Sequence, residues 1–113
     1  MGVVYVKPGV EFTVIAPGGF RILSAIDQAA ATLGRDLTIT SGTDGTHSGP
    51  DDPHHRGEAY DVRSHDLASN VKYEVLATIN GFLNQDQFYG FLEAPDSDTE
   101  HIHVQVKKGT VYP

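Results

Sequence analysis

Apolar residues recur at helical spacing in two stretches of the chain. Pro17, Gly18 and Gly19 break the preceding pattern, and in residues 20–34 the apolar positions lie three or four apart, on one face of a helix; they are Phe20, Leu23, Ile26, Ala30 and Leu33. Gly34 is a natural C-terminal stop. The second stripe follows Ser64 and Asp66, either of which can cap a helix, and consists of Leu67, Val71, Val75, Leu76, Ile79 and Leu83. Gly81 weakens the C-terminal end of this second helix. We therefore predict two amphipathic helices.

Shorter apolar and β-branched segments predict strands around these helices. Two of them, residues 2–6 and 12–15, are separated by a Lys-Pro-Gly turn signal. The other predicted strands are residues 36–41, 58–63, 87–93 and 100–107. Residues 42–56 have no periodicity and are rich in Gly and Pro, and a loop this long in a compact domain is usually functional or disordered.

Composition narrows the class of protein. The 113 residues suit a single domain spanning 1–113. The net charge of −7 disfavours nucleic acid and anionic membranes as partners, because either would need a basic face. Cysteine is absent, so disulfides and thiolate ligands are excluded. No signal peptide or membrane span is expected, which predicts a soluble chain that is cytoplasmic or delivered to the cell wall by a phage.

Two clusters combine imidazoles with carboxylates. The first runs from His54 to Asp61, and the second comprises Glu100, His101 and His103. Residues two apart in a strand share a face, so both imidazoles of the second cluster can face one cleft while Ile102, Val104 and Val106 face the core. Hydrolytic zinc takes about three imidazole or carboxylate ligands and keeps one position for water. The two clusters therefore predict a metal site with one Zn²⁺ per chain.

These motifs resemble a known family. His54-x-x-Gly57-x-Ala59-x-Asp61 and Glu100-x-x-His103 are similar to the motifs of the M15 peptidases, which are zinc carboxypeptidases, dipeptidases and phage endolysins that cleave bacterial cell-wall peptides. The resemblance spans residues 37–106. It implies a small α+β domain of the hedgehog/DD-peptidase type, with an antiparallel sheet packed against two main helices. It also implies that His54, Asp61 and His103 bind zinc and that Glu100 is the general base.

The roles of the other residues near the predicted zinc ligands are inferred from their spacing and from the same resemblance. His101 is expected to hold the water or to hydrogen-bond the tetrahedral intermediate. Strict strand alternation puts Glu100 on the face opposite His103, so its role requires an irregular start to that strand. Asp98 is the alternative base, because it precedes His101 by three residues.

The chain departs from the family pattern at two places. Asp52 stands where the family often has Ser, two residues before the first ligand. The Arg that usually follows the Ser-Gly turn and steadies the substrate is missing after Gly42. The candidates to replace it are Arg63, His47 and Arg56. Arg63 alternatively orients Asp61 or forms a surface salt bridge.

The other aromatic and imidazole candidates are less specific. His47 and His55 are favoured as solvated loop residues, with His47 kept as a substrate contact. Tyr89 and Phe91 share a strand face, so Tyr89 is a further candidate to contact substrate, with at least one of the two expected in the core.

Three readings of function stay open at this point. The first is a zinc metallopeptidase that hydrolyses peptidoglycan peptides, with bonds next to D-amino acids as the expected substrate. The second is a catalytically inactive zinc-binding module of the same fold, which binds a cell-wall fragment or a protein partner. The third is a metal-free structural or interaction domain. The sequence predicts neither the oligomeric state nor whether the enzyme is a carboxypeptidase, dipeptidase or endopeptidase.

Overall fold

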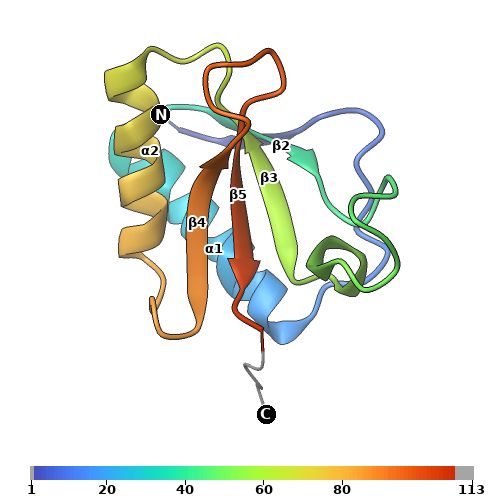
Figure 1. Ribbon diagram of the computed structural model, residues 1–113. Helices are drawn as coiled ribbons and strands as arrows, with labels where there is room; N and C mark the ends of the chain where they lie inside the picture. Colours follow the sequence, from blue (N-terminus) through green and yellow to red (C-terminus); the bar gives the residue numbers. More distant parts are fainter. Residues whose placement is uncertain (1, 109–113) are drawn as a thin grey trace.

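The computed structural model describes residues 2–108 and contains one sheet and two long helices (Figure 1). The elements in chain order are β1 (Val4–Val6), α1 (Pro17–Leu33), β2 (Leu37–Ser41), the 3-10 helix η1 (Pro53–Arg56), β3 (Ala59–Arg63), α2 (Ser69–Gly81), β4 (Phe88–Glu93) and β5 (His101–Val106). The chain is therefore an α+β domain, as the sequence predicts. Within residues 2–108, no helix is long and apolar enough to cross a membrane.

The five strands form a mixed sheet in the order β1-β2-β3-β5-β4. β1 pairs with β2 in parallel, and all other pairs are antiparallel. The expectation of an antiparallel sheet is therefore wrong at this edge. The reason is the connection: α1 lies between β1 and β2 in the chain and returns it to the same end of the sheet, which is the connection that parallel neighbours require.

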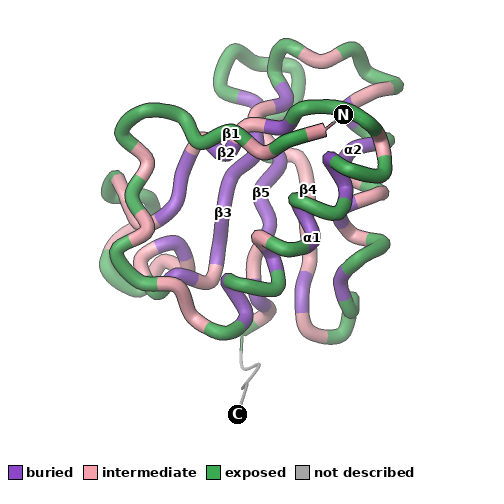
Figure 2. Tube along the Cα trace, turned by 180° about the vertical axis from the view of Figure 1, so that it is seen from behind, coloured by how far each residue is buried: buried purple, intermediate pink, exposed green. Residues whose placement is uncertain are grey.

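The two faces of the sheet have different environments. Both helices pack on one face, and Figure 2 views the molecule from that side with α1 in front of the sheet. Tyr60 and Val62 of β3 and Ile102 and Val104 of β5 point to the helices and are fully buried. The alternate residues of the same strands point to the opposite, helix-free face, which is seen in Figure 1. The prediction that Ile102, Val104 and Val106 face the core is confirmed.

Both predicted helices are present, but α1 begins at Pro17, inside the segment predicted to be a break, because proline is favoured in the first turn of a helix. α1 ends at Gly34, which adopts the left-handed conformation at φ 60° as expected. α2 begins later than predicted, with Ala68 at its N-cap and no side-chain cap, so neither Ser64 nor Asp66 caps it. The Ser64 hydroxyl instead donates to Glu100.

The predicted strand at residues 12–15 does not form, and the strand at residues 2–6 shortens to β1. The backbone N–H groups of Glu11 and Thr13 donate instead to side-chain oxygens of Asp44 and Thr43, each over 3.0 Å. Hydrogen bonds to side chains thus take the place of the strand pairing that was predicted for residues 12–15. This segment fastens the start of the loop that precedes η1.

The start of α1 contacts the turn between η1 and β3. The backbone N–H of Ala16 donates to the carbonyl oxygen of Gly57 over 3.2 Å. A Cβ added at Gly19 would lie 2.0 Å from that same oxygen. Gly57 is itself left-handed at φ 70°. The close contact between Gly19 and Gly57 therefore holds the end of η1 against the start of α1.

We predict that Gly19→Ala lowers the free energy of unfolding by about 1–3 kcal/mol, because a backbone oxygen cannot move aside as a side chain can. Urea denaturation followed by circular dichroism measures this change. Gly81→Ala is the matched control: nothing lies within 4 Å of its added Cβ, so it should be neutral or stabilising by up to about 1 kcal/mol. Equal stability of Gly19→Ala and the wild type would contradict the close contact.

Candidate metal centre

A cleft of about 320 Å³ opens on the helix-free face of the sheet, beside η1. Residues from four parts of the chain line it: His47, Ser48, Asp52, His54, Asp61, Glu93, His101 and His103. Asp61 of β3 lies directly opposite His103 of β5 in the antiparallel register. His54 approaches them from η1. The structure thus brings both predicted imidazole ligands to Asp61, although the groups of side chains whose ligand atoms lie within 4.8 Å of one another contain either His54 or His103 with Asp61 and not all three.

His54 is held by a carboxylate two residues before it. Asp52 is the N-cap of η1, and its Oδ1 accepts from the His54 backbone N–H over 2.9 Å. The same oxygen lies 2.7 Å from Nδ1 of the imidazole. The other ring nitrogen, Nε2, lies 3.0 Å from Oδ1 of Asp61. Asp52, which stands where the resembled family often has Ser, therefore aims the His54 ring at Asp61.

His103 is held in a similar way by an amide. Its Nε2 lies 2.8 Å from Oε1 of Gln105. The amide nitrogen of Gln105 donates to the Val106 carbonyl over 3.2 Å, so the amide oxygen is the atom left for the imidazole N–H. Nδ1 of His103 then faces Oδ1 of Asp61 at 3.1 Å. Two imidazole nitrogens therefore meet at one carboxylate oxygen.

His101 and Glu93 form the outer part of the cleft. Nδ1 of His101 lies 2.8 Å from the Thr99 carbonyl oxygen, and Nε2 lies 2.8 Å from Oε1 of Glu93. Oδ2 of Asp61 is 3.6 Å from the same Nε2. The carboxylate of Glu93 is also 3.5 Å from Nδ1 of His103. The expected position of His101 in the cleft is therefore observed, with Glu93 as its partner.

The sequence reasoning missed Glu93, although a signal for it was present. Tyr89, Phe91 and Glu93 alternate along β4, so the face assigned to the first two also belongs to the third. What the sequence did not supply was the pairing, in which Glu93 lies opposite His101. Only that register places the carboxylate beside the imidazoles.

The hydrogen-bonding needs of the three imidazoles point to a cation. Each of His54, His101 and His103 has one ring nitrogen on an outer oxygen and the other directed at a carboxylate. A neutral imidazole has only one N–H, so with that N–H on the outer oxygen each inward contact with a carboxylate oxygen requires either a protonated ring or a cation between the two atoms. A bound metal ion would meet this requirement at all three rings. Two sets of side chains that share Asp61 have their ligand atoms within 4.8 Å of one another: Asp61, Glu93, His101 and His103; and His47, His54 and Asp61.

The pKa shifts of Asp61 and His54 show that the cleft favours a negative charge on Asp61 and a positive charge beside it. Burial raises the pKa of Asp61, but the hydrogen bonds from His103 and His54 outweigh it and hold the pKa far below its usual value. Burial lowers the pKa of His54, and the hydrogen bond and charge of Asp61 outweigh it, so the pKa is raised overall. Asp61 therefore stays ionised and available as a metal ligand.

Glu100 lies elsewhere. β5 begins at His101, so the predicted irregular start is absent and Glu100 turns toward α2, where it is 2% exposed. Its carboxylate accepts from Lys72 Nζ over 2.8 Å, from Ser64 Oγ over 3.0 Å and from the Asp96 backbone N–H over 2.8 Å. The hydrogen bond from Lys72 is the main cause that lowers its pKa to about 2. This carboxylate does not line the histidine cleft, and Glu93 takes the position expected for it. The alternative base, Asp98, does not line that cleft either.

The predicted substrate contacts separate into three environments. His47 stacks on His54 with ring centroids 3.7 Å apart, and its Nε2 lies 3.0 Å from Ser41 Oγ, so it belongs to the cleft. Tyr89 stacks on Phe91 at 5.5 Å, and it is Phe91, not Tyr89, that approaches His103, at 5.1 Å. Arg63 borders a neighbouring hollow.

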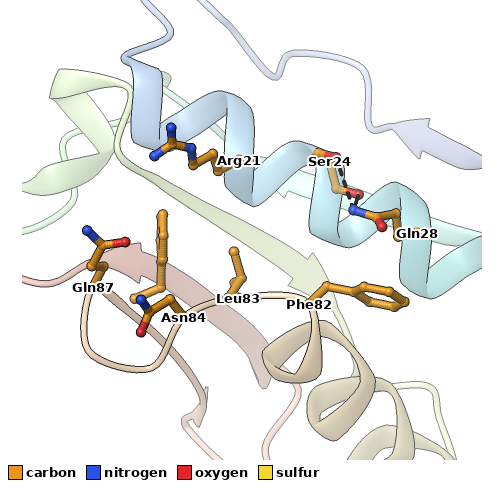
Figure 3. A pocket seen from close by; sticks show the side chains of 8 residues that line it. Arg21, Ser24, Gln28, Phe82, Leu83, Asn84 and Gln87 are labelled. Carbon is orange, nitrogen blue, oxygen red and sulfur yellow. Dashed lines mark hydrogen bonds between the residues drawn. The ribbon is translucent and has the colours of Figure 1, made fainter. Parts of the chain in front are cut away.

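A further hollow of about 350 Å³ lies between α1 and the segment that joins α2 to β4 (Figure 3). Arg21, Ser24 and Gln28 border it from α1, and Phe82, Leu83, Asn84, Gln87 and Phe88 border it from the other side. Among these described residues, Arg21 is the only ionisable one. The hollow therefore offers no set of metal ligands comparable to the histidine cleft.

We predict that Asp52→Asn weakens metal binding about 10- to 100-fold, because it removes the charge that polarises and orients His54. The asparagine oxygen can still cap η1, so the fold should persist. Titration of the metal-free protein with zinc in the presence of a competing chelator measures the affinity. Asp51→Asn removes an exposed neighbouring charge and is the control that should leave affinity unchanged. Equal affinities for the two variants would contradict the role of Asp52.

We predict that Glu100→Gln lowers the melting temperature by roughly 10 °C, because it leaves the ammonium of Lys72 without its main partner. The pKa of Glu100 is depressed from 4.5 to about 2, so its contribution is complete above pH 4.5 and is lost as the pH falls toward 2. Thermal unfolding across this range should show less acid sensitivity in the variant. Glu93→Gln, at the cleft rim, is the control, and a similar loss of stability in it would refute the assignment.

Comparisons with known proteins did not assign the chain to a family. No protein-family model matches it, and neither does any curated protein or solved structure. The resemblance of the two histidine motifs to the M15 peptidases is therefore still a prediction from the sequence, and the geometry of the cleft is the observation that bears on function.

Proposed function

We propose that the chain is a zinc-dependent peptidase of the hedgehog/DD-peptidase fold that hydrolyses peptide bonds in bacterial cell-wall peptides. The observation that carries the proposal is the convergence of His54 Nε2 and His103 Nδ1 on Oδ1 of Asp61, at 3.0 and 3.1 Å. Side chains outside this trio hold each imidazole so that its inward nitrogen faces Asp61, where a metal would bind. A scaffold needs no such arrangement.

The donor set favours zinc as the cation. His54, Asp61 and His103 provide two nitrogens and one carboxylate oxygen, and all three residues are buried. Catalytic zinc sites use three ligands of this kind and keep a fourth position for water. When bound, zinc lowers the pKa of its water toward 7 and polarises a substrate carbonyl. The outer partners of the ligands, Asp52 and Gln105, fix which ring nitrogen is presented.

Proton transfer falls to Glu93 and His101 under this proposal. Glu93 is 46% exposed at the side chain, so it can meet solvent and substrate, whereas Glu100 is sealed against Lys72. Its Oε1 can accept a proton from the attacking water as the new C–O bond forms, and can return it to the nitrogen as the C–N bond breaks. His101, 2.8 Å away, orients this carboxylate, and its protonated ring can donate to the developing negative charge. Glu93 thus replaces Glu100 as the proposed general base.

The choice of substrate rests on the resemblance to the M15 peptidases. The motif pattern from His54 to Asp61 and at His103 is similar to that of enzymes acting on cell-wall peptides with D-amino acids. The cleft lies on the sheet face that neither α1 nor α2 covers, which suits an extended peptide laid along the strands.

The position of Glu100 favours the second candidate function. The family motif places its base at this residue, and here the carboxylate is occupied by Lys72, Ser64 and the Asp96 backbone. If Glu93 does not supply the missing base, the chain is a zinc-binding module that holds a cell-wall fragment or a protein partner without cleaving it.

Metal content and hydrolysis together test the proposal. We expect about one zinc per chain by elemental analysis and its loss in a His54→Ala/His103→Ala double variant. His65→Ala, an exposed imidazole outside the cleft, should retain the metal. The wild type should release peptides or amino acids from purified peptidoglycan. Glu93→Gln should lower kcat about 100-fold or more while keeping zinc.

Results other than those expected favour one of the alternative functions or another catalytic base. Zinc binding without any release of product supports the inactive module. Full activity of Glu93→Gln with metal bound shows that another group is the base. Absence of zinc binding after incubation with the ion overturns the metal site itself and leaves an interaction domain.

A further inference from the structure

One oxygen of Asp61 is not used by the imidazoles of the proposed zinc site. Nε2 of His54 and Nδ1 of His103 both meet Oδ1, at 3.0 and 3.1 Å. The other oxygen, Oδ2, forms no hydrogen bond with any residue in the described range 2–108. The nearest imidazole nitrogen to it is Nε2 of His101, at 3.6 Å. Since an ionised carboxylate has lone pairs on both oxygens, Asp61 can serve a second cation through Oδ2.

His101 and Glu93 lie beside this unused oxygen. Nδ1 of His101 is 2.8 Å from the Thr99 carbonyl oxygen, so the single N–H of a neutral ring is at Nδ1. Nε2 is then directed at two carboxylates, with Oε1 of Glu93 at 2.8 Å and Oδ2 of Asp61 at 3.6 Å. This contact requires either a protonated ring or a cation among the three groups.

The spacing of these three groups suits a metal ion. Ligands arranged tetrahedrally at about 2.0–2.1 Å from zinc lie about 3.3 Å from one another. The distances from Nε2 of His101 to Glu93 and to Asp61, 2.8 and 3.6 Å, are both within about 0.5 Å of that value. The three side chains also belong to a set whose ligand atoms all lie within 4.8 Å of one another. An ion between them therefore needs only small movements of the side chains.

His47 does not form an equivalent site with His54, although these two imidazoles and Asp61 also have ligand atoms within 4.8 Å of one another. The two rings are stacked, with centroids 3.7 Å apart and planes only 3° from parallel. An imidazole binds a metal along the nitrogen lone pair, which lies in the plane of the ring. Two parallel planes at this separation share no point where one ion can meet both nitrogens. Glu93 and His101 are therefore the better partners for a second ion at Asp61.

Burial separates the two sets of ligands. The side chains of His54 and His103 are 4% and 6% exposed, whereas those of His101 and Glu93 are 25% and 46% exposed. An ion in solution therefore reaches the outer pair more easily and is held there by fewer buried groups. The cleft contains three carboxylates. A first divalent cation balances two of these charges, so a second cation still meets a negative site.

We propose that Glu93, His101 and Oδ2 of Asp61 form a second metal site, which binds a divalent transition-metal ion such as zinc and shares the Asp61 carboxylate with the first ion. One imidazole nitrogen and two carboxylate oxygens are ligands that zinc accepts. The second ion binds more weakly than the first, because its ligands are more exposed.

The consequence of this second site rests on the proposed peptidase function. Under that function, Oε1 of Glu93 accepts a proton from the attacking water. A metal ion bound to the same oxygen occupies the lone pair that would accept the proton. Zinc in excess of one equivalent therefore inhibits hydrolysis, although the first equivalent is required for it.

Zinc titration of the metal-free protein tests the second site without any measurement of hydrolysis. We expect two equivalents by isothermal titration calorimetry, the second with lower affinity. Nitrogen NMR of the imidazoles distinguishes the two sites. The metal-facing nitrogens of His54 and His103 should shift with the first equivalent, and Nε2 of His101 should shift with the second.

Variants assign the second equivalent to its ligands. Glu93→Gln and His101→Ala should each lose the second equivalent and keep the first. The matched control is Asp98→Asn, which removes an exposed carboxylate that lines the neighbouring hollow and not the histidine cleft. It should still bind two ions. Because Glu93→Gln and Asp98→Asn remove the same charge, a difference between them cannot come from net charge.

Hydrolysis of cell-wall peptides then tests the inhibition. The activity of the wild type should fall about 100-fold as zinc rises from one to two equivalents, which is the effect expected for the loss of a general base. Asp98→Asn should show the same fall.

The outcomes separate the second site from the peptidase. Binding of one equivalent only by the wild type, or a second equivalent that both Glu93→Gln and His101→Ala retain, overturns the second site whether or not peptides are cleaved. Two bound equivalents with unchanged or higher activity overturn the inhibition. Two bound equivalents in a protein that cleaves nothing support the second site and refute the peptidase, and the inhibition is refuted with it.

Discussion

The pairing of β3 with β5 is the constraint on which the site depends. One face of this pair buries Tyr60, Val62, Ile102 and Val104 under the helices, and this burial fixes the register. With the register set, the opposite face must place Asp61 across from His103. A slip of one residue would exchange the core with the ligands. The hydrophobic core and the candidate metal ligands of this strand pair are therefore specified by the same alternation.

The cleft concentrates charge that the protein alone does not balance. Asp52, Asp61 and Glu93 meet within one pocket of an already acidic chain. Each imidazole between them is held by an outer oxygen, so its orientation does not rely on the inner contact. Such outer partners are typical of metal sites, where they set the tautomer and keep the ligands in place. The arrangement is preorganised for a cation at the point where the imidazoles converge.

Glu93 and Glu100 both lie next to the loop that joins β4 to β5, but their side chains are in opposite environments. Glu93 is the last residue of β4 and lies across from the first residue of β5, while Glu100 is one position before that strand. Alternation sends one to the open face and the other toward α2. The buried glutamate meets Lys72 and fastens the loop at Asp96 to the helix. The exposed one lies beside His101 in the histidine cleft.

The sequence by itself determined the two helices and the alternation of β3, β4 and β5, because these follow from short-range periodicity. It also indicated His54, Asp61 and His103 as candidate ligands, through their residue chemistry and the resemblance of their motifs to a known family. Only the tertiary structure decided how those elements pair. The parallel edge depends on the crossover through α1. The partner of His101 depends on strand register, and the sequestration of Glu100 depends on Lys72, which is 28 positions away in the chain. Contacts between residues distant in sequence carry no local pattern, so they become visible only when the chain is folded.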